Sequence, residues 1–425
     1  MTTLTIRPAP AGLRGSLRVP GDKSISHRAL LLAARADGTS RISGLSPGAD
    51  VMATLAAMSA FGAGIESSGG TVTVLGGRLH EPETVIDVGN SGTGIRLMAG
   101  WAAGLEGLSV LVGDRSIARR PMGRVTEPLR RMGAGIDGRD DGRLPPLVIR
   151  GGGLHGIDYA PPVPSAQVKS ALLLAGLAAD GPTTVRESLP TRVHTEQMLA
   201  TCGVRIETVP GAVTVYPGPL APADFAVPGD PSQAAFWVVA ACITPGSDLT
   251  VEQVYVGPHR AGFLDVLERM GADIEVLDRD PATAVADIRA RTSELSATDV
   301  GGAEIPDLID EIPVLAVAAA HASGTTTFRD AAELKVKESD RIAAMVAALG
   351  GVGATIEGHA DGLSVTGRGS PLPGGTVDSV GDHRVAMALA VAALASSGPV
   401  RVEGWDCVGT SYPGFERDLE GCTSR

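Results

Sequence analysis

Six stretches of the chain combine the apolar spacing of buried helices with a high content of alanine, glycine and leucine. Each stretch follows a short polar run and ends at a glycine, and successive glycines are about 70 residues apart. These glycines are Gly38, Gly107, Gly181, Gly246, Gly324 and Gly398. Because the usual solenoid repeats are shorter than this interval, the pattern predicts six small α/β units.

A second pattern recurs five times with a similar interval: an amphipathic helix, then Gly-x-x-Ile followed by an acidic residue, and then a strand. In one example, residues 264–270 form the helix and Gly271 follows its last turn, where glycine tolerates the left-handed conformation. Strands rich in β-branched residues are predicted after it, as at 72–75 and 363–366. The five glycines are Gly62, Gly133, Gly203, Gly271 and Gly353. Each unit should therefore contain two helices and several strands.

The length of the chain and two matching tripeptides predict its domain organisation. A chain of 425 residues is longer than one hydrophobic core usually serves. Pro-Gly-Asp occurs at 20–22 and again at 228–230, with three complete repeats between them. We therefore expect the chain to cross between domains at these two points. Residues 20–228 would form one domain, and residues 1–19 with 229–425 would form the other.

The polar runs that open the six helices contain most of the residues able to bind an anion. They are KSISHR at 23–28, NSGT at 90–93, SAQVK at 165–169, DPSQ at 230–233, DLIDE at 307–311 and GDHR at 381–384. The N-terminus of a helix presents unpaired N–H groups and a partial positive charge. Six such ends that faced one space would form a strong anion-binding site.

Charge and hydropathy narrow the class of function. A net charge of −12 argues against nucleic acid, which requires a basic surface. Lysine and arginine concentrated at helix starts in an acidic protein indicate a small anionic ligand instead. No apolar run reaches the ~18 residues of a membrane span, and residues 1–7 lack the apolar core of a signal peptide. A cytoplasmic protein with no membrane partner is expected.

Familiar cofactor and metal signatures fit the chain poorly. Gly21–Ser24 resembles the end of a P-loop, but Asp22 replaces the glycine that should precede the lysine. Residues 89–94 have their glycines in the wrong order for a dinucleotide fingerprint, so a helix-entry turn is the better interpretation. The four cysteines (Cys202, Cys242, Cys407 and Cys422) lack metal-ligand spacing. We expect neither a metal nor a cofactor.

Two charged clusters are candidates for chemistry, although each also has an ordinary structural explanation. Lys337 and Arg341 are four residues apart and would share one face of a helix that begins there. The alternative is a solvated helix start. Asp307, Asp310 and Glu311 precede an apolar run and could simply compensate a helix dipole. Carboxylates in a basic anion site are costly unless they transfer protons, which favours a catalytic role.

Seven strings in the chain resemble, in order and spacing, those of 5-enolpyruvylshikimate-3-phosphate synthase (EPSP synthase). They are PGDKSISHR at 20–28, GNSGT at 89–93, RPM at 120–122, SAQVKS at 165–170, KVKESDR at 335–341, GDHR at 381–384 and TSYP at 410–413. The resemblance spans almost the whole chain. The chain is similar to the branch of the family that has SAQ, rather than SSQ, in the third repeat.

The resemblance implies a two-domain inside-out α/β barrel with three βαβαββ units in each domain and the active site in the interdomain cleft. It implies a monomeric transferase of the shikimate pathway, which leads through chorismate to the aromatic amino acids. The enzyme moves the enolpyruvyl group of phosphoenolpyruvate to the 5-hydroxyl of shikimate 3-phosphate through a tetrahedral intermediate and releases phosphate. Both substrates carry a phosphate and a carboxylate, so a site rich in arginine and lysine is expected.

The resemblance also assigns the site residues. The shikimate 3-phosphate ligands would be Lys23, Ser24, Arg28, Ser165, Gln167, Arg192, Asp310 and Lys337. The phosphoenolpyruvate ligands would be Lys23, Asn90, Gly92, Arg120, Gln167, Arg341 and Arg384. The catalytic residues would be Asp310, as base for the attacking hydroxyl, and Glu338 with Lys23, which would exchange protons with the methylene carbon.

Several positions depart from the family pattern. Ala166 replaces the second serine of the SSQ form, and Thr410 occupies the place of a phosphate-binding lysine. Arg192 and His194 are candidates to supply the missing contacts to shikimate 3-phosphate, and Glu333 lies where other members have asparagine.

Sensitivity to glyphosate is a further implication of the resemblance. This anion is slightly longer than phosphoenolpyruvate and would occupy the same place. Gly92 is retained where the backbone comes closest to that ligand, while Leu97 replaces a proline found in other members.

Two other functions remain to be compared. A UDP-N-acetylglucosamine enolpyruvyl transferase would share the fold and phosphoenolpyruvate, but the strings at 20–28 and 335–341 favour shikimate 3-phosphate. A non-catalytic anion-binding protein on the same scaffold is more remote, because Asp310 and Glu338 would not help to bind anions.

Overall fold

The structure is a computed structural model in which residues 2–423 are described. The chain forms two compact units, each with its own internal contacts. Unit 1 comprises residues 1–20 and 228–425, and unit 2 comprises residues 21–227. Each unit contains three β-sheets, so the described residues form six sheets in all.

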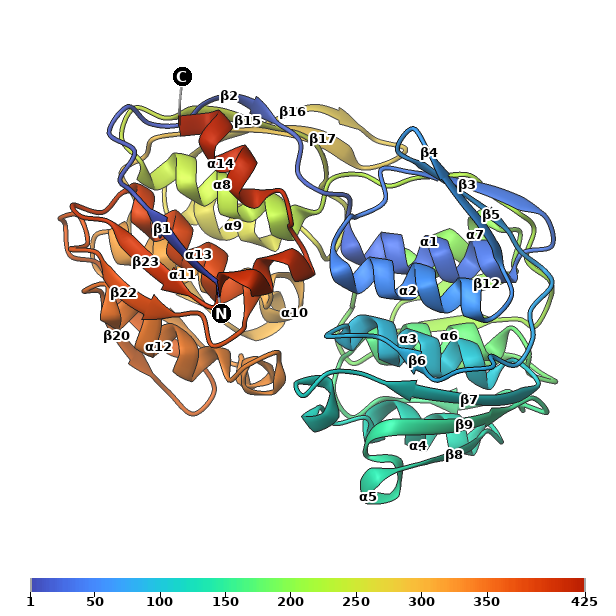
Figure 1. Cartoon of the computed structure of the whole chain (residues 1–425). Helices are drawn as coiled ribbons and strands as arrows, with labels where there is room; N and C mark the ends of the chain where they lie inside the picture. Colours follow the sequence, from blue (N-terminus) through green and yellow to red (C-terminus); the bar gives the residue numbers. More distant parts are fainter. Residues whose placement is uncertain (1, 424–425) are drawn as a thin grey trace. The chain divides into compact units, whose positions relative to one another are not determined.

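Unit 2 contains three successive groups of helices and strands (Figure 1). The first consists of α1 (Lys23–Arg35), β3 (Thr39–Ser43), α2 (Ala49–Ala60), β4 (Gly64–Ser68) and β5 (Thr71–Leu75). The second consists of β6 (Ile86–Asp87), α3 (Gly92–Ala103), β7 (Gly107–Val112), the 3₁₀ turn η1 (Ile117–Arg119), α4 (Gly123–Arg131), β8 (Gly135–Gly138), α5 (Arg139–Gly142) and β9 (Leu144–Gly151). The third consists of β10 (Asp158–Tyr159), α6 (Ala166–Gly176), β11 (Thr183–Arg186), α7 (His194–Thr201), β12 (Ile206–Val209) and β13 (Ala212–Val215), and β14 (Phe225–Ala226) follows it.

Unit 1 begins with β1 (Thr3–Ile6) and β2 (Arg14–Leu17) and continues with three further groups. The fourth group consists of α8 (Pro231–Ile243), β15 (Asp248–Tyr255), α9 (Gly262–Arg269), β16 (Asp273–Asp280) and β17 (Val285–Arg291). The fifth consists of β18 (Asp299–Val300), η2 (Gly302–Glu304), α10 (Ile305–Leu308), α11 (Ile312–His321), β19 (Thr325–Phe328), η3 (Ala332–Val336), α12 (Arg341–Gly351), β20 (Thr355–Gly358) and β21 (Leu363–Thr366). The sixth consists of β22 (Gly375–Asp378), α13 (His383–Leu394), β23 (Val400–Glu403), η4 (Trp405–Thr410) and α14 (Phe415–Thr423).

The six sheets share one strand order. In each, a short edge strand runs parallel to the next strand, as β6 does to β7 and β18 to β19. Five sheets then add an antiparallel hairpin, and β1 completes the sixth by pairing with β23. The edge strand of the first sheet is β14 and that of the fourth is β2, so with β1 in the sixth, three sheets are completed by distant segments. The predicted six α/β repeats are confirmed.

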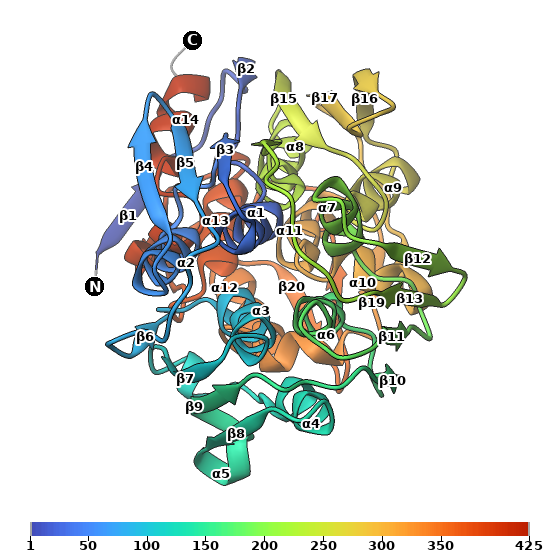
Figure 2. The same cartoon turned by 90° about the vertical axis from the view of Figure 1, so that its right-hand side faces the viewer.

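One helix of each repeat lies inside its unit, with the sheets outside. In unit 2, α3 contacts both α1 and α6, and Arg28 of α1 hydrogen-bonds Ser170 of α6. The three helices are drawn nearly end-on in Figure 2, with strands of that unit around them. In unit 1, α8, α11 and α13 contact one another, and every residue of α8 and α13 is buried. Helices enclosed on all sides need small apolar residues to approach closely, which explains the alanine-rich pattern.

The two glycine patterns have different outcomes. All five glycines of the Gly-x-x-Ile pattern directly follow the capping residue of an amphipathic helix and have positive φ, so this prediction is confirmed. The prediction that the buried helices end at glycines is wrong, because the helices end several residues earlier. For example, α3 ends at Ala103 and Gly107, with φ of +115°, begins the following strand. That glycine is needed for the turn into the strand rather than for the helix end.

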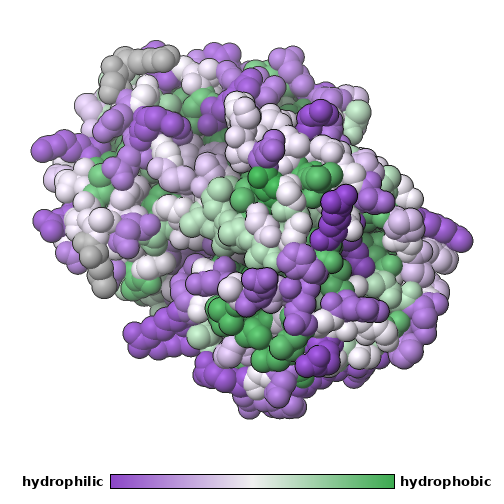
Figure 3. Space-filling model, turned by 45° about the vertical axis from the view of Figure 1, so that its right-hand side comes forward, coloured by the Kyte–Doolittle hydropathy of each residue, from purple (hydrophilic) through white to green (hydrophobic). Residues whose placement is uncertain are grey.

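The face drawn in Figure 3 is mainly polar. On this face, hydrophilic side chains predominate and hydrophobic residues form smaller patches between them. Large exposed apolar side chains belong to separate elements, such as Met52 in α2, Leu75 in β5 and Val276 in β16. Within residues 2–423, no helix has both the length and the hydropathy needed to cross a membrane.

Candidate active site

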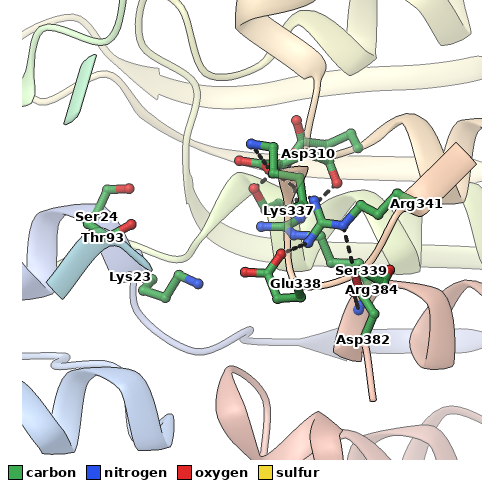
Figure 4. Close-up of polar contacts among 12 residues, drawn as sticks. Lys23, Ser24, Thr93, Asp310, Lys337, Glu338, Ser339, Arg341, Asp382 and Arg384 are labelled. Atoms are coloured by element: carbon green, nitrogen blue, oxygen red, sulfur yellow. Dashed lines mark hydrogen bonds and ion pairs between the residues drawn. The ribbon is translucent and has the colours of Figure 1, made fainter. Parts of the chain in front are cut away.

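The start of α1 places a lysine beside a buried carboxylate. Asp22 caps the helix by accepting a hydrogen bond from the N–H of Ile25 at 2.8 Å. Lys23 follows, and its Nζ lies 3.2 Å from Oδ2 of Asp50, which is buried in the first turn of α2. Figure 4 shows Lys23 and Ser24 together at this end of the helix. The ion pair limits where the Lys23 ammonium can lie.

Arg28, one turn further along α1, joins three helices of unit 2. Its guanidinium donates to the carbonyl oxygen of Ser24 at 2.8 Å, to Oγ1 of Thr195 at 2.7 Å and to Oγ of Ser170 at 2.6 Å. The side chain is buried, so these contacts hold it within α1, α6 and α7. Ser24, its neighbour, accepts a weaker hydrogen bond at 3.4 Å from Arg192, which precedes α7.

His27 on the same helix is fixed between two hydroxyl groups. Its Nδ1 lies 2.7 Å from Oγ1 of Thr54, and its Nε2 lies 3.3 Å from Oγ of Ser91. Complete burial, together with the positive charges of Lys23 and Arg28, holds the pKa of His27 well below its usual value. The imidazole is therefore neutral near pH 7, and it adds no charge to the helix start.

The first turns of α3 and α6 are joined through Gln167. Its Nε2 donates to Oγ1 of Thr93 at 2.9 Å, and its Oε1 accepts from Arg96 at 2.7 Å. A β-carbon at Gly92 would lie 2.2 Å from Nη1 of Arg120 and 3.5 Å from Nη1 of Arg96. Two guanidinium groups therefore lie against the backbone at Gly92, as an anion site at this helix start requires.

The remaining predicted residues of unit 2 lie at helix entries. Ser165 caps α6 and accepts from the N–H of Val168 at 3.4 Å. Asn90 precedes the capping residue of α3, and its side-chain amide donates to Asp114 at 2.6 Å. His194, buried, begins α7. These positions agree with the sequence analysis, in which helix starts carry the candidate ligands.

In unit 1 a carboxylate lies between two cations. Oδ1 of Asp310 is 3.1 Å from Nζ of Lys337 and 3.2 Å from Nη1 of Arg341 (Figure 4). Asp310 belongs to the turn just before α11, whereas Arg341 begins α12. Two positive charges therefore lie within 3.2 Å of this carboxylate oxygen.

Arg341 is surrounded by three carboxylates. Besides Asp310, its Nη2 lies 2.6 Å from Glu338 and its Nε lies 2.9 Å from Asp382. Burial opposes the charge of Arg341, but the carboxylates of Asp382, Glu338 and Asp310 outweigh it and raise the pKa of Arg341. Burial would raise the pKa of Asp382, and Arg341 more than compensates, so the net direction is downward. The buried pair is therefore charged.

Arg384 completes the cluster from the first turn of α13. Its Nη1 donates to the carbonyl oxygen of Asp310 at 3.0 Å and lies 3.5 Å from Oε1 of Glu311. Glu311 is buried and also accepts a short hydrogen bond from Ser232 of α8. The three buried helices of unit 1 thus bring their first turns into contact, which agrees with the predicted convergence of helix starts within this unit.

Two details of the predicted clusters are wrong. Lys337 and Arg341 do not share a helix face, because residues 332–336 form a 3₁₀ turn and α12 begins only at Arg341, where Asp340 caps it. The two residues still meet, since both reach Asp310. Asp307 does not join this cluster, because its carboxylate pairs instead with Nδ1 of His259 at 3.1 Å.

Two positions named for their departure from the family lie in short 3₁₀ turns. Glu333 is in η3, just before Lys337 in the chain, and Thr410 is the last residue of η4.

The structure adds residues to which the sequence analysis gave no role in the site. Arg96, Asp50 and Asp382 each contact a predicted site residue directly. The sequence did contain an indication for Arg96, because Arg96 is the one charged residue in the apolar helix α3. A charge inside a buried helix needs partners, so its presence indicates a polar site nearby. Asp50 lies in the second helix of the repeat that Lys23 opens, and their contact depends on the packing of α1 against α2.

Comparisons with known proteins agree with this geometry. The model of the EPSP synthase (3-phosphoshikimate 1-carboxyvinyltransferase) family matches residues 8–419. A curated protein from Shouchella clausii (strain KSM-K16) is 50% identical over 426 residues, covering 99% of both chains. Another, from Geobacter sulfurreducens, is 51% identical over 426 residues with the same coverage. Both are named 3-phosphoshikimate 1-carboxyvinyltransferase.

Solved structures give the same result. An EPSP synthase from Acinetobacter baumannii matches with a TM-score of 0.87 and 40% identity, covering 99% of this chain and 98% of that chain. The enolpyruvyl transferase NikO from Streptomyces tendae matches with a TM-score of 0.79 at 19% identity, covering 99% and 97%. The second match shows likeness of fold alone.

Proposed function

The chain belongs to the EPSP synthase family, and from that premise we propose which of its residues bind and transform the substrates. The enzyme transfers the enolpyruvyl group of phosphoenolpyruvate to the 5-hydroxyl of shikimate 3-phosphate in the shikimate pathway. The alternative acceptor, UDP-N-acetylglucosamine, is not favoured, because the full-length relatives are named for 3-phosphoshikimate.

Phosphoenolpyruvate is bound by guanidinium groups from both units. Arg120 contributes from unit 2, and Arg341 and Arg384 contribute from unit 1, with Lys23, Gln167 and the backbone at Asn90 and Gly92 completing the set. Planar guanidinium groups suit carboxylate and phosphate because they donate two parallel hydrogen bonds. The contact between the Gly92 backbone and Arg120 supports this assignment.

Shikimate 3-phosphate is bound by the other helix starts. Lys23, Ser24, Arg28, Ser165, Gln167 and Arg192 contribute from unit 2, and Asp310 and Lys337 contribute from unit 1. The active site therefore requires a cleft between a domain of residues 20–228 and one of residues 1–19 with 229–425. Both sets of residues belong to one chain, so a monomer would suffice for this site, and we propose a monomeric enzyme in the cytoplasm.

Asp310 is the base for the attacking hydroxyl, and its contacts with Lys337 and Arg341 are the observation that carries the proposal. Asp310 accepts the proton of the 5-hydroxyl as that oxygen bonds to C2 of phosphoenolpyruvate. The methylene carbon meanwhile takes a proton from Lys23 or Glu338. The product of this addition is a tetrahedral intermediate that carries both a methyl and a phosphate group.

Elimination then restores the double bond. Glu338, with Lys23, removes a proton from the methyl group, and the C–O bond to phosphate breaks with its electrons leaving on phosphate. Glu338 lies 2.6 Å from Arg341. A substrate anion on Arg341 would compete for that guanidinium and free the Glu338 carboxylate for proton transfer. Proton transfer of this kind contributes roughly 10² to 10⁴ in rate, so positioning of two repelling anions supplies the larger share.

The test is phosphate release from phosphoenolpyruvate. We expect release only when shikimate 3-phosphate is also present, and none with either substrate alone or with UDP-N-acetylglucosamine as acceptor. Phosphate release with UDP-N-acetylglucosamine would show that shikimate 3-phosphate is the wrong acceptor. Binding of both substrates without release would favour an anion-binding protein on the same scaffold.

A further inference from the structure

We propose that Lys169 is a positioning residue that holds the loop carrying Arg192 in place for the acceptor substrate, an inference that rests on the proposed function. Lys169 lies in the second turn of α6, and its side chain is only 1% exposed. Its Nζ is 2.9 Å from Oε2 of Glu187 and 2.7 Å from Oε1 of Glu196. One buried ammonium group therefore joins two carboxylates from separate segments.

The two carboxylates lie on either side of Arg192. Glu187 directly follows β11, and Glu196 is in the first turn of α7, so the loop 187–193 spans the distance between them. Ser188 and Pro190 of this loop are exposed and contribute little packing. The ion pairs at the start of the loop and just beyond its end must therefore do much to hold the loop in one conformation.

A second contact tethers the residue next to Arg192. Oγ1 of Thr191 donates to Oε1 of Glu187 at 2.5 Å, and the carbonyl oxygen of Thr191 accepts from Nζ of Lys169 at 3.4 Å. The other oxygen of the same Glu187 carboxylate pairs with Lys169. Lys169 thus reaches Thr191 both directly and through Glu187, one residue before Arg192.

Arg192 in turn contacts the start of α1. Its Nη1 donates to Oγ of Ser24 at 3.4 Å, and Ser24 is the residue after Lys23 in that helix. The next residue of α6, Ser170, contacts Arg28 of α1 and Thr195 of α7. Lys169 and Ser170 therefore fix the loop and α7 against α1, where the proposed phosphate ligands lie.

The charge balance argues against stability as the main role of this cluster. Buried ion pairs require desolvation that their attraction only partly offsets, and apolar residues of similar volume often stabilise a protein as well. A lysine with two carboxylates also leaves a net negative charge, in a protein whose ligands here are anions. The arrangement is better explained by the definite position that it gives to Arg192.

The test compares four single variants by steady-state kinetics with both substrates. Arg192→Ala is expected to raise KM for shikimate 3-phosphate roughly tenfold or more, because it removes a charge-assisted hydrogen bond donor. Lys169→Met should raise the same KM to a similar extent, and Thr191→Val by several-fold, while KM for phosphoenolpyruvate stays within about twofold. Thr126→Val is the matched control: Thr126, like Thr191, is a buried threonine whose hydroxyl donates a hydrogen bond, in this case to the carbonyl oxygen of Gly142 at 3.1 Å. It should change neither KM.

A double-mutant cycle separates positioning from general damage. In the Arg192→Ala background, Lys169→Met and Thr191→Val should cause no further rise in KM for shikimate 3-phosphate, because their effect acts through Arg192. Additive effects, or an equal rise in both KM values, would overturn the inference. Thr191→Val decides the question if Lys169→Met does not fold. If Arg192→Ala alone leaves the KM unchanged, Arg192 is not a ligand, and that part of the proposed function fails together with this inference.

Discussion

The guanidinium of Arg341 illustrates how single residues are held in this protein. It contacts Asp310, Glu338 and Asp382, and its own side chain is 1% exposed. Because each partner comes from a different turn, the position of Arg341 depends on three segments of unit 1 at once. As a proposed anion ligand, Arg341 would be held in place by Asp310 and Asp382 while the anion competes with Glu338 for its guanidinium.

Asp310→Asn is the residue-scale prediction for the proposed base. The amide keeps the size of the side chain but cannot accept the hydroxyl proton, so kcat should fall by about 10² or more with a modest change in either KM. Asp307→Asn is the matched control, because Asp307 also precedes α11 but pairs with His259. Steady-state assays of phosphate release measure kcat and KM for both variants. Near-normal turnover of Asp310→Asn would show that another group is the base.

Gly92→Ala should affect the phosphoenolpyruvate site. The added methyl group would lie 2.2 Å from Nη1 of Arg120, so that guanidinium must move. KM for phosphoenolpyruvate should rise, and inhibition by the longer anion glyphosate should weaken more, by roughly 1–3 kcal/mol. Inhibition constants against phosphoenolpyruvate, compared with its KM, measure the difference. An equal loss for both ligands, or no loss, would place Gly92 outside the binding site.

Sequence reasoning identified residues with recognisable motifs but missed their supports. Asp310, Arg341 and Lys169 lie in runs that the sequence analysis quoted, and Arg96 does not, but the roles of Lys169 and Arg96 became clear only with their partners known. Both are charged residues within apolar helices, a pattern that indicates a buried polar site without saying what occupies it. Asp50 could not be assigned, because its contact with Lys23 depends on the packing of α1 against α2.

At the scale of elements, local signals predicted helices better than their ends. The six buried helices followed from small apolar residues, and the Gly-x-x-Ile pattern located five helix ends correctly. The helix expected from Lys337 failed because Asp340 caps α12 and accepts from the N–H groups of Ile342 and Ala343. The helix begins after the capping aspartate because this side chain satisfies backbone N–H donors that otherwise lack partners. The four-residue spacing of the charges did not determine where the helix starts.

Two helix caps in unit 1 should contribute different amounts to the free energy of unfolding. Asp382 caps α13 and also pairs with the buried Arg341 at 2.9 Å, whereas Asp340 caps α12 and is exposed. Asp382→Ala leaves a buried charge with one partner fewer, so it should lower the free energy of unfolding by about 3–5 kcal/mol. Asp340→Ala should cost only ~1 kcal/mol. Chemical denaturation measures both, and equal losses would show that the ion pair adds nothing to the cap.

At the scale of the whole molecule, strand partners depend on contacts that periodicity does not encode. Thr3 in β1 is paired with Glu403 in β23, and Arg14 in β2 is paired with Asp248 in β15. The local sequence pattern can identify these strands, but which strand each one pairs with depends on the packing of the core around them. The matching Pro-Gly-Asp tripeptides predicted that the first residues belong with the C-terminal part of the chain, but not which strands they would pair with.

Substrate binding should bring the two domains together if both contribute ligands. Shikimate 3-phosphate is proposed to contact Lys23 and Ser165 in one domain and Asp310 and Lys337 in the other, so its binding should favour a closed form. Small-angle scattering should then show a smaller radius of gyration with this substrate than without it. An unchanged radius in a sample shown by calorimetry to bind would rule out closure.

The central claim is that this chain joins its two substrates by addition and elimination. The most direct test is mass spectrometry of the product formed in D₂O. Addition of a solvent-derived deuteron to the methylene carbon gives a methyl group, and elimination removes only one of its three hydrogens. The account therefore predicts 5-enolpyruvylshikimate 3-phosphate that carries deuterium in its vinyl group, together with released phosphate. A product without deuterium, or phosphate released without the enol ether, would contradict it.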